Sequence, residues 1–447
     1  MSTTMTKPEY EKPGRVESDP LDHSASHISD QTREEKPDDE NLPPVDGGIR
    51  AWLFLSACFV LEAVGWGFPT AFGVFQNHYR HDPAFEGSRS IAVIGTCSTG
   101  MAYLSFPFTI SMMMAFPRIQ CWVSTAGLLV MSLALALGSF STTINHLILS
   151  QGVAYGIGCG LANTPSVYFV PDWFVKRKGL AYGIIWSGSA VTGTIFPVCF
   201  EALISRYGWQ TSLRIASIVI FVASIGFIPY HKPRTRDTHT RLRQIDLGFL
   251  LNPLFLTHEL GNILQGMGYF IPSIFLTSHA HSVGATGILS SLALTLYNIT
   301  SVFGCVIQGY MVDHYHVSNC ILGATVGAVG SIFLIWGLSN SIAPLYLFAI
   351  LYGLSAGSFS STWSAVTNEV RASDKKADIR MVFSFMEAGR GIGNMVSGPL
   401  SEALFHAGSS LQGHAWGAYG SEFSYLVIFT GLTALFGGVG FFGKYMR

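Results

Sequence analysis

Two charged side chains, Glu387 and Arg390, lie three residues apart inside one long apolar stretch, residues 380–404. Residues at positions i and i+3 share one face of a helix, so these two can form an ion pair. A guanidinium can also bind a carboxylate of a ligand through two parallel hydrogen bonds. The sequence therefore leaves two interpretations open, a substrate-binding or gating site at Arg390 and a structural ion pair between helices.

A second buried carboxyl is expected at Glu62, near the middle of the apolar stretch 49–75. Trp66 and Thr70 follow it at four-residue intervals and so share its helix face. Glu62 can carry a proton, meet a cationic group or hydrogen-bond to a neighbouring backbone. Polar side chains at helical spacing within apolar stretches are explained better by a water-filled cavity than by lipid. The further candidates for such a cavity are Asn163, Asn262, Gln265, Tyr269, Asn298 and Trp363.

The elements that must position these residues are long apolar helices. About 20 apolar residues in a helix span the ~30 Å hydrocarbon core of a bilayer. Only 12% of the residues are charged, against ~25% in soluble proteins, and the mean hydropathy is +0.39. The sequence predicts an all-α integral membrane protein with 12 transmembrane helices. The 12 apolar stretches are 49–75, 90–115, 119–140, 146–170, 178–203, 211–230, 247–276, 285–311, 319–338, 343–366, 380–404 and 421–443.

Lysine and arginine alternate between the connections of these stretches. One set of connections, with the C-terminus, holds 15 basic residues and the opposite set holds 3. The first set is Arg118, Lys176, Arg177, Lys178, Lys232, Arg234, Arg236, Arg241, Arg243, Arg371, Lys375, Lys376, Arg380, Lys444 and Arg447, and the second is Arg80, Arg89 and Arg206. Because basic loops stay in the cytosol, both termini and residues 231–246 are predicted inside, and 405–420 outside.

The longest basic connection follows the sixth apolar stretch and divides the chain in two. Residues 1–45 are rich in Pro, Ser and charged residues and hold no long apolar run, which predicts a disordered cytosolic tail. We expect six helices in 46–230, a cytosolic linker in 231–246, and six helices in 247–447. Two six-helix halves joined by a cytosolic linker resemble the major facilitator fold, in which the substrate site lies between the halves.

Two short motifs carry a closer resemblance. Asp46-Gly47-Gly48, followed by Trp52, is similar to the first signature of the monocarboxylate porter family within the major facilitator superfamily. Residues 173–183, WFVKRKGLAYG, resemble the family's second signature. The polar tail and the run GRGIGN, residues 389–394, resemble the fungal branch of the family.

The resemblance implies a cavity lined by helices one, four, seven and ten. It also assigns Asp313, which follows Gly309 at the spacing of a facilitator loop motif, to gating. The basic residues of the second signature are expected to anchor a helix end at the anionic inner leaflet and to belong to a gating loop; they are Lys176, Arg177 and Lys178. Small residues at four-residue spacing predict close helix contacts; they are Gly152, Gly156, Gly160, Gly179, Gly183 and Ser187.

The sequence departs from the family's animal proton-coupled members at three matching positions, where Thr70, Asn298 and Val302 replace charged residues.

The predicted function is a secondary active transporter that moves a small organic molecule, an organic anion or a fungal secondary metabolite, by alternating access, with efflux as the favoured direction. One alternative is proton-coupled uptake of a monocarboxylate or vitamin. An alternative of another class is a non-transporting nutrient sensor with the transporter fold.

Other functional classes find no support in the residue pattern. No Ser/His/Asp or HExxH constellation predicts an enzyme, and no motif predicts ATP or another cofactor. The histidine pairs 279/281 and 314/316 have too few neighbouring ligands for zinc, so no metal site is expected. No basic surface with interleaved aromatics predicts nucleic-acid binding. The expected partners are a small-molecule substrate, a proton as candidate coupling ion and the lipid bilayer, with the plasma membrane as the expected location and a monomer sufficient for function.

Overall fold

The computed structural model describes residues 43–83, 85, 90–234, 246–286, 288–408, 413 and 416–445. Most of the expected tail, residues 1–42, lies outside these ranges, as do residues 235–245 of the expected linker. The tail prediction and most of the linker prediction therefore stay predictions.

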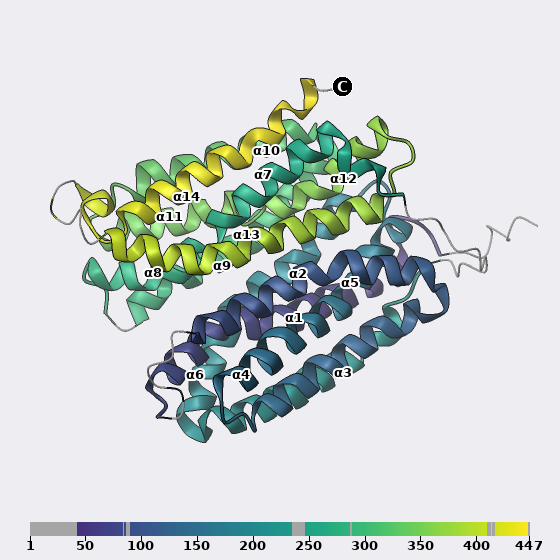
Figure 1. Cartoon of the computed structure of the whole chain (residues 1–447). Coiled ribbons are helices and arrows are strands. Elements are labelled where there is room, and N and C mark those ends of the chain that lie inside the picture. The colour runs from purple at the N-terminus through teal and green to yellow at the C-terminus, as the bar shows by residue number, and fades with distance from the viewer. Residues whose placement is uncertain are drawn as a thin grey trace, which may run out of the picture. The chain divides into compact units, whose positions relative to one another are not determined.

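All regular structure in the described ranges is helical (Figure 1). Helices α1 to α6 are α1 (Gly48–His81), α2 (Ile91–Ala115), α3 (Gln120–Gly138), α4 (Ile144–Leu147), α5 (Tyr155–Trp173) and α6 (Lys178–Ile225). Helices α7 to α14 are α7 (Pro253–Tyr269), α8 (Ile271–Ser282), α9 (Ile288–His314), α10 (Val317–Gly330), α11 (Ile342–Ser355), α12 (Trp363–Ser373), α13 (Ile379–Gly408) and α14 (Ser424–Gly437). Short π-helical or 3₁₀ segments continue several of them, as η3 (Ile148–Ala154), η6 (Ser331–Trp336), η7 (Phe359–Thr362) and η10 (Gly438–Tyr445).

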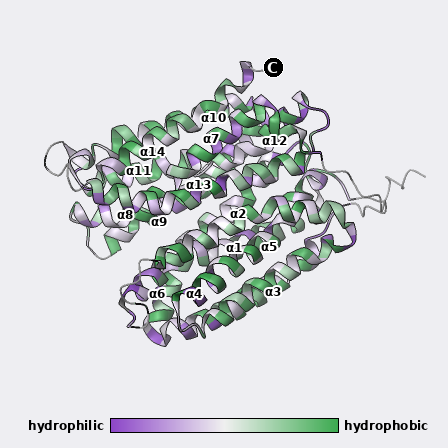
Figure 2. Cartoon of the chain, viewed as in Figure 1, coloured by the Kyte–Doolittle hydropathy of each residue, from purple (hydrophilic) through white to green (hydrophobic). Residues whose placement is uncertain are grey.

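The predicted apolar stretches fall on these helices. Eight helices of the described part are long and apolar enough to cross a membrane by themselves. Helix α6 holds two predicted spans, because Gly208 has φ +76° and ψ 164° and the chain turns there. A left-handed φ is accessible to glycine without the steric penalty that a Cβ brings. Figure 2 shows hydrophobic residues along most of the helix lengths and hydrophilic residues gathered at the helix ends.

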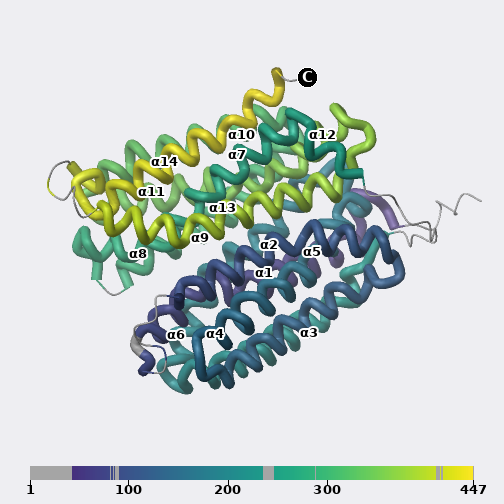
Figure 3. The backbone as a smooth tube through the Cα atoms, in the orientation of Figure 1, coloured from purple at the N-terminus to yellow at the C-terminus, as the bar shows by residue number. Residues whose placement is uncertain are grey.

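We call α1–α6 the first bundle and α7–α14 the second bundle. The two meet where α6 packs along α9 and where α2 packs along α13 (Figure 3). At the first of these contacts, a Cβ added at Gly179 or Gly183 would collide with a backbone carbonyl oxygen of α9. The close helix contact predicted from the spacing of these glycines is therefore confirmed.

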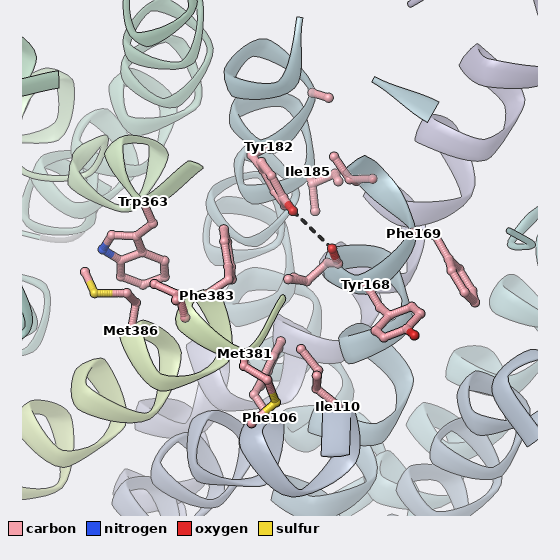
Figure 4. Packing of buried hydrophobic residues seen from close by; sticks show 14 of the residues in the cluster. Phe106, Ile110, Tyr168, Phe169, Tyr182, Ile185, Trp363, Met381, Phe383 and Met386 are labelled. Atoms are coloured by element: carbon pink, nitrogen blue, oxygen red, sulfur yellow. Dashed lines mark hydrogen bonds between the residues drawn. The ribbon is translucent and has the colours of Figure 1, made fainter. Parts of the chain in front are cut away.

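Three clusters of buried apolar residues show how the bundles are joined. One cluster takes residues from both bundles, and its rings include Tyr182 of α6 beside Phe383 of α13 (Figure 4). It lies at the end of the helices where residues 174–177, 231–234 and 374–378 are found, which we call the linker end. The second cluster belongs to the first bundle alone and the third to the second bundle alone. The apolar core therefore joins the bundles at the linker end and is divided toward the opposite end.

Candidate functional site

Helix α13 places Arg390 in the interior, with 1% of the residue exposed. Its Nη1 donates a hydrogen bond to Oε1 of Gln265 on α7. The guanidinium carbon lies 4.2 Å from the centre of the Tyr269 ring, which is cation–π distance. The two helices can approach so closely because a Cβ at Gly393 would come within 2.5 Å of the carbonyl oxygen of Ile263.

Glu387 lies one turn before Arg390 and is 2% exposed, but the two do not form an ion pair within 4.0 Å in the described part of the chain. The two interpretations of Arg390, a substrate-binding or gating site and a structural ion pair between helices, therefore stay predictions. Glu387 is nevertheless near enough for its charge to interact with that of Arg390 and with that of Glu62, which lies on α1 of the first bundle and is 6% exposed. Tyr103 of α2 lies near all three of these groups.

These residues form a buried polar group at the meeting of the bundles, which we call the central cluster. Its members are Glu62, Trp66, Tyr103, Gln265, Tyr269, Glu387 and Arg390. The indole N–H of Trp66 faces the Glu62 carboxyl, and its ring lies 4.8 Å from that of Tyr103. Two carboxyls and one guanidinium carry a net charge of zero when the carboxyls together hold one proton. A bound anion would keep this balance if a second proton bound with it.

Other sequence-predicted residues support the helices around the cluster. Asn262 donates from Nδ2 to the carbonyl oxygen of Met386, 2.6 Å away, and so ties α7 to α13 beside Glu387. Asn163 approaches the backbone of α1 at Gly65, and its Oδ1 is buried without a hydrogen-bond partner. Thr70 is exposed, and its hydroxyl donates to a carbonyl oxygen of its own helix.

Asn298 and Trp363 differ in where the structure places them. Asn298 donates from Nδ2 to the carbonyl oxygen of Gly193, 3.0 Å away, at the contact between α9 and α6. This amide therefore joins the bundles rather than the central cluster. Trp363 begins α12, and its ring centre lies 6.0 Å from the guanidinium carbon of Arg390.

At the linker end, Asp313 of α9 accepts hydrogen bonds from the backbone N–H groups of Gly179 and Leu180, at 2.7 and 2.8 Å. These N–H groups open α6, and a carboxylate is stabilised at a helix N-terminus. A cavity of about 340 Å³ adjoins this contact. It is lined by Val175, Lys176, Lys178, Val312, Asp313, Ser364, Ala365 and Asn368.

Asp46 performs a similar role before α1. Its carboxylate accepts hydrogen bonds from the backbone N–H groups of three consecutive residues, 175–177, at 2.9 to 3.0 Å. Partial burial opposes ionisation of Asp46, but these N–H groups prevail and hold the pKa of its carboxyl below its usual value. The two motifs that carried the family resemblance, around Asp46 and around residues 173–183, therefore contact each other directly.

Comparison with known proteins agrees with this architecture. The sequence model described as the Major Facilitator Superfamily matches residues 54–257 and 259–446. The chain belongs to the Major Facilitator Superfamily. It is therefore a secondary transporter and an integral, multi-pass membrane protein.

Curated relatives of this transporter include several fungal proteins. It is 26% identical over 415 residues to the MFS transporter asaE of Aspergillus flavus, covering 92% of this chain and 90% of the relative. It is 25% identical over 420 residues to the agnestins efflux protein AgnL12 of Paecilomyces divaricatus, covering 92% and 93%. Monocarboxylate transporter 13 of Rattus norvegicus is 25% identical over 374 residues, covering 81% of this chain and 83% of that one.

The fold is also found among solved structures. The crystal structure of the human organic anion transporter MFSD10 (TETRAN) superposes with a TM-score of 0.60 at 15% identity. The match covers 87% of this transporter and 98% of the human chain. At this identity the likeness concerns the fold.

Two contacts at the linker end were not expected from the sequence. Arg380 of α13 donates from Nη2 to Asp172 of α5 at 2.7 Å, and its guanidinium carbon lies 4.2 Å from the ring centre of Tyr168. This pair is a second tie between the bundles.

His231, at the start of the linker, is buried with a serine hydroxyl 3.0 Å from each ring nitrogen, and burial lowers its pKa to about 3. An uncharged imidazole therefore fastens the start of the linker to the first bundle.

We expect Asp46→Asn to lower the free energy of unfolding by about 1–2 kcal/mol at neutral pH, because neutral hydrogen bonds replace charge-assisted ones. The pKa of Asp46 is lower in the folded protein than its ordinary value of 3.8. The stabilisation is therefore complete above about pH 5 and is lost as pH falls through the lowered folded pKa. Thermal unfolding of both proteins at pH 7 and pH 3 measures the difference, which should shrink at the lower pH.

The matched control for this prediction is Asp246→Asn. Asp246 also lies at the linker end, but its Oδ1 accepts a single backbone hydrogen bond, from Gly248 in its own turn. This variant should change the unfolding temperature less than Asp46→Asn does. Equal effects of the two variants, or an Asp46→Asn effect that grows on acidification, would contradict the role given to Asp46.

Proposed function

We propose that this transporter exports a small organic anion of the secondary-metabolite class together with a proton. The observation that carries the proposal is Arg390, a buried guanidinium at the meeting of the bundles without a carboxylate partner within 4.0 Å in the described part of the chain. An unpaired buried charge is unfavourable, and a bound anion would compensate it. The similar proteins support export and an anionic substrate, since one relative is named an efflux protein and the fold neighbour is named an organic anion transporter.

The proton enters the proposal through Glu62 and Glu387. Their carboxyls come from different bundles and lie near enough to interact with each other and with Arg390 electrostatically. When an anion occupies Arg390 and neutralises it, the two carboxyls are most stable with both protons bound. When the anion has left, one proton can leave as well. Loading of the anion and uptake of a proton are thereby linked at a single site.

We further propose that the chain is a member of the monocarboxylate porter family. The support is the direct contact between its two signature motifs, through Asp46 and residues 175–177, and the similarity to monocarboxylate transporter 13. Uptake of a monocarboxylate is the second candidate function, and it uses the same Arg390 site with the opposite direction of net flux.

The conformation fits one stage of an alternating-access cycle. We propose that the linker end is cytosolic, as the 15-to-3 distribution of basic residues indicates. The core shared by both bundles lies at this end, so the conformation is closed to the cytosol. Secondary transporters then move one bundle against the other around a fixed central site.

Deletion of the gene in its source organism tests the proposed function. At least one acidic metabolite should accumulate severalfold in cells relative to medium, and re-expression of the intact gene should restore its release. The purified protein in proteoliposomes should then move that metabolite faster when the compartment that holds the metabolite is acidified. Faster uptake from medium would favour the second candidate, and unchanged distribution of every acidic metabolite would contradict both.

A further inference from the structure

Two buried hydrogen-bond donors beside the central cluster have no acceptor in the described part of the chain. They are Nε of Arg390 and Nε1 of Trp363. Each residue is 1% exposed, and the Trp363 ring centre lies 6.0 Å from the guanidinium carbon. Most buried donors in proteins are paired, so two unpaired donors this close together need an explanation. A ligand with acceptor oxygens would supply the missing partners.

The surroundings of these donors are flat and aromatic. Trp363 packs edge-on against Trp186 at 5.5 Å and against Phe383 at 5.9 Å. Trp186 and Phe383 are stacked with Tyr182, at ring distances between 4.8 and 5.8 Å and interplanar angles of 16° to 23°. Figure 4 labels Tyr182, Phe383 and Trp363 of this group. On the other side, the guanidinium of Arg390 covers the Tyr269 ring. Both bundles contribute to this aromatic wall, since Tyr182 and Trp186 lie on α6 and the other rings lie on α7, α12 and α13.

We propose that the transported molecule is a planar, conjugated acid whose oxyanion accepts hydrogen bonds from both Arg390 Nε and Trp363 Nε1. The two donors select an anionic oxygen pair, as in a carboxylate or an acidic phenol with a neighbouring carbonyl. The aromatic wall selects a planar body, because rings stack favourably in offset or edge-on arrangements. This inference rests on the proposed function and specifies its substrate class.

Binding to the purified full-length protein in lipid nanodiscs tests the substrate class directly. Radiolabelled naphthoate serves as the planar anion. Cyclohexanecarboxylate is a competitor that has the negative charge but no planar ring, and naphthamide is a competitor that has the planar ring but no charge. Naphthoate should bind about tenfold more tightly than either competitor, which corresponds to ~1.4 kcal/mol. Equal affinity for cyclohexanecarboxylate, or tighter binding of naphthylmethylammonium as a cationic probe, would overturn the proposal.

The role of the indole N–H is tested by Trp363→Phe, which keeps an aromatic ring and removes the donor. Naphthoate affinity should fall about tenfold, because a hydrogen bond to an ionised group is lost. The matched control is Trp336→Phe, since Trp336 is equally buried but donates to Nδ1 of His279 at 2.8 Å within the second bundle. The control should unfold at a lower temperature while keeping naphthoate affinity. Unchanged affinity in Trp363→Phe would show that this donor does not contact the ligand.

These results separate the substrate class from the proposed function. Loss of metabolite release in the deletion strain, together with no preference for naphthoate, would overturn the planar-acid inference alone. Retained release of every acidic metabolite, together with no binding of either carboxylate, would overturn both.

Discussion

Arg390→Gln is expected to reduce transport of an anionic substrate by roughly 30-fold or more. Removing one partner of a buried, hydrogen-bonded charge pair costs about 2–5 kcal/mol, and each 1.4 kcal/mol is a factor of ten in affinity. Glutamine can keep a neutral contact with Gln265 but cannot supply the charge that binds the anion. Initial rates in proteoliposomes, normalised to the reconstituted protein, measure the effect, and substrate binding to detergent-purified protein shows whether affinity is lost.

Arg390→Lys distinguishes charge from shape at this position. Lysine keeps the positive charge but loses the planar fork and the contact of a guanidinium with the Tyr269 ring. We expect it to bind substrate more weakly than the native protein and better than Arg390→Gln. Arg214→Gln is the control, because Arg214 is exposed on the first bundle and donates to Ser139. If Arg390→Gln is folded, reaches the membrane and carries an anion at the native rate, the anion site lies elsewhere.

The sequence predicts best those features that repeat along it. The lengths of the apolar stretches and the alternation of basic connections predict a helical membrane protein. The four-residue spacing of Gly179 and Gly183 predicts a close helix contact, because it places both glycines on one face of a helix. The depth of Glu387 and Arg390 is also predictable, since it needs only a rise of 1.5 Å per residue. All these predictions depend on residues that are near in sequence.

Pairings between distant segments could not be predicted in the same way. Arg390 has Glu387 on its own helix, yet it bonds to Gln265, which is 125 positions away. The choice depends on how α7 packs on α13, and no local pattern encodes it. His231 is a polar residue in a basic connection, and local sequence favours a solvated side chain there. Its burial follows from serine hydroxyls on two other helices, Ser124 and Ser166, that happen to face it.

Asp313→Asn should shift the transporter toward the conformation that is open at the linker end, by roughly tenfold or more in population. Asp313 joins the second bundle to the N-terminus of α6 through two hydrogen bonds at 2.7 and 2.8 Å. Hydrogen bonds to a charged group contribute about 1.5–3 kcal/mol each. An asparagine keeps one acceptor oxygen and loses the charge that favours a helix N-terminus. Adding Arg380→Gln removes the tie to Asp172 as well and should increase the shift further.

Cysteine labelling in a background without the seven native cysteines measures this shift. Val366→Cys reports opening, because Val366 is 1% exposed in the core shared by the bundles. Asn368→Cys is the reference, since position 368 is exposed and lines the cavity at the linker end. It should react only from the cytosolic side, and reaction from outside would reverse the proposed orientation.

Asp374→Asn is the matched control for Asp313→Asn, because Asp374 lies at the same end but accepts from Lys376 within its own loop. It breaks no tie between bundles and should leave Val366→Cys protected. Because Asp313→Asn weakens only the closed state at the linker end, it should raise Val366→Cys labelling while leaving Asn368→Cys labelling unchanged. A rise at both positions would indicate unfolding of this end, and no rise at position 366 would mean that the shared apolar core holds the linker end closed without Asp313.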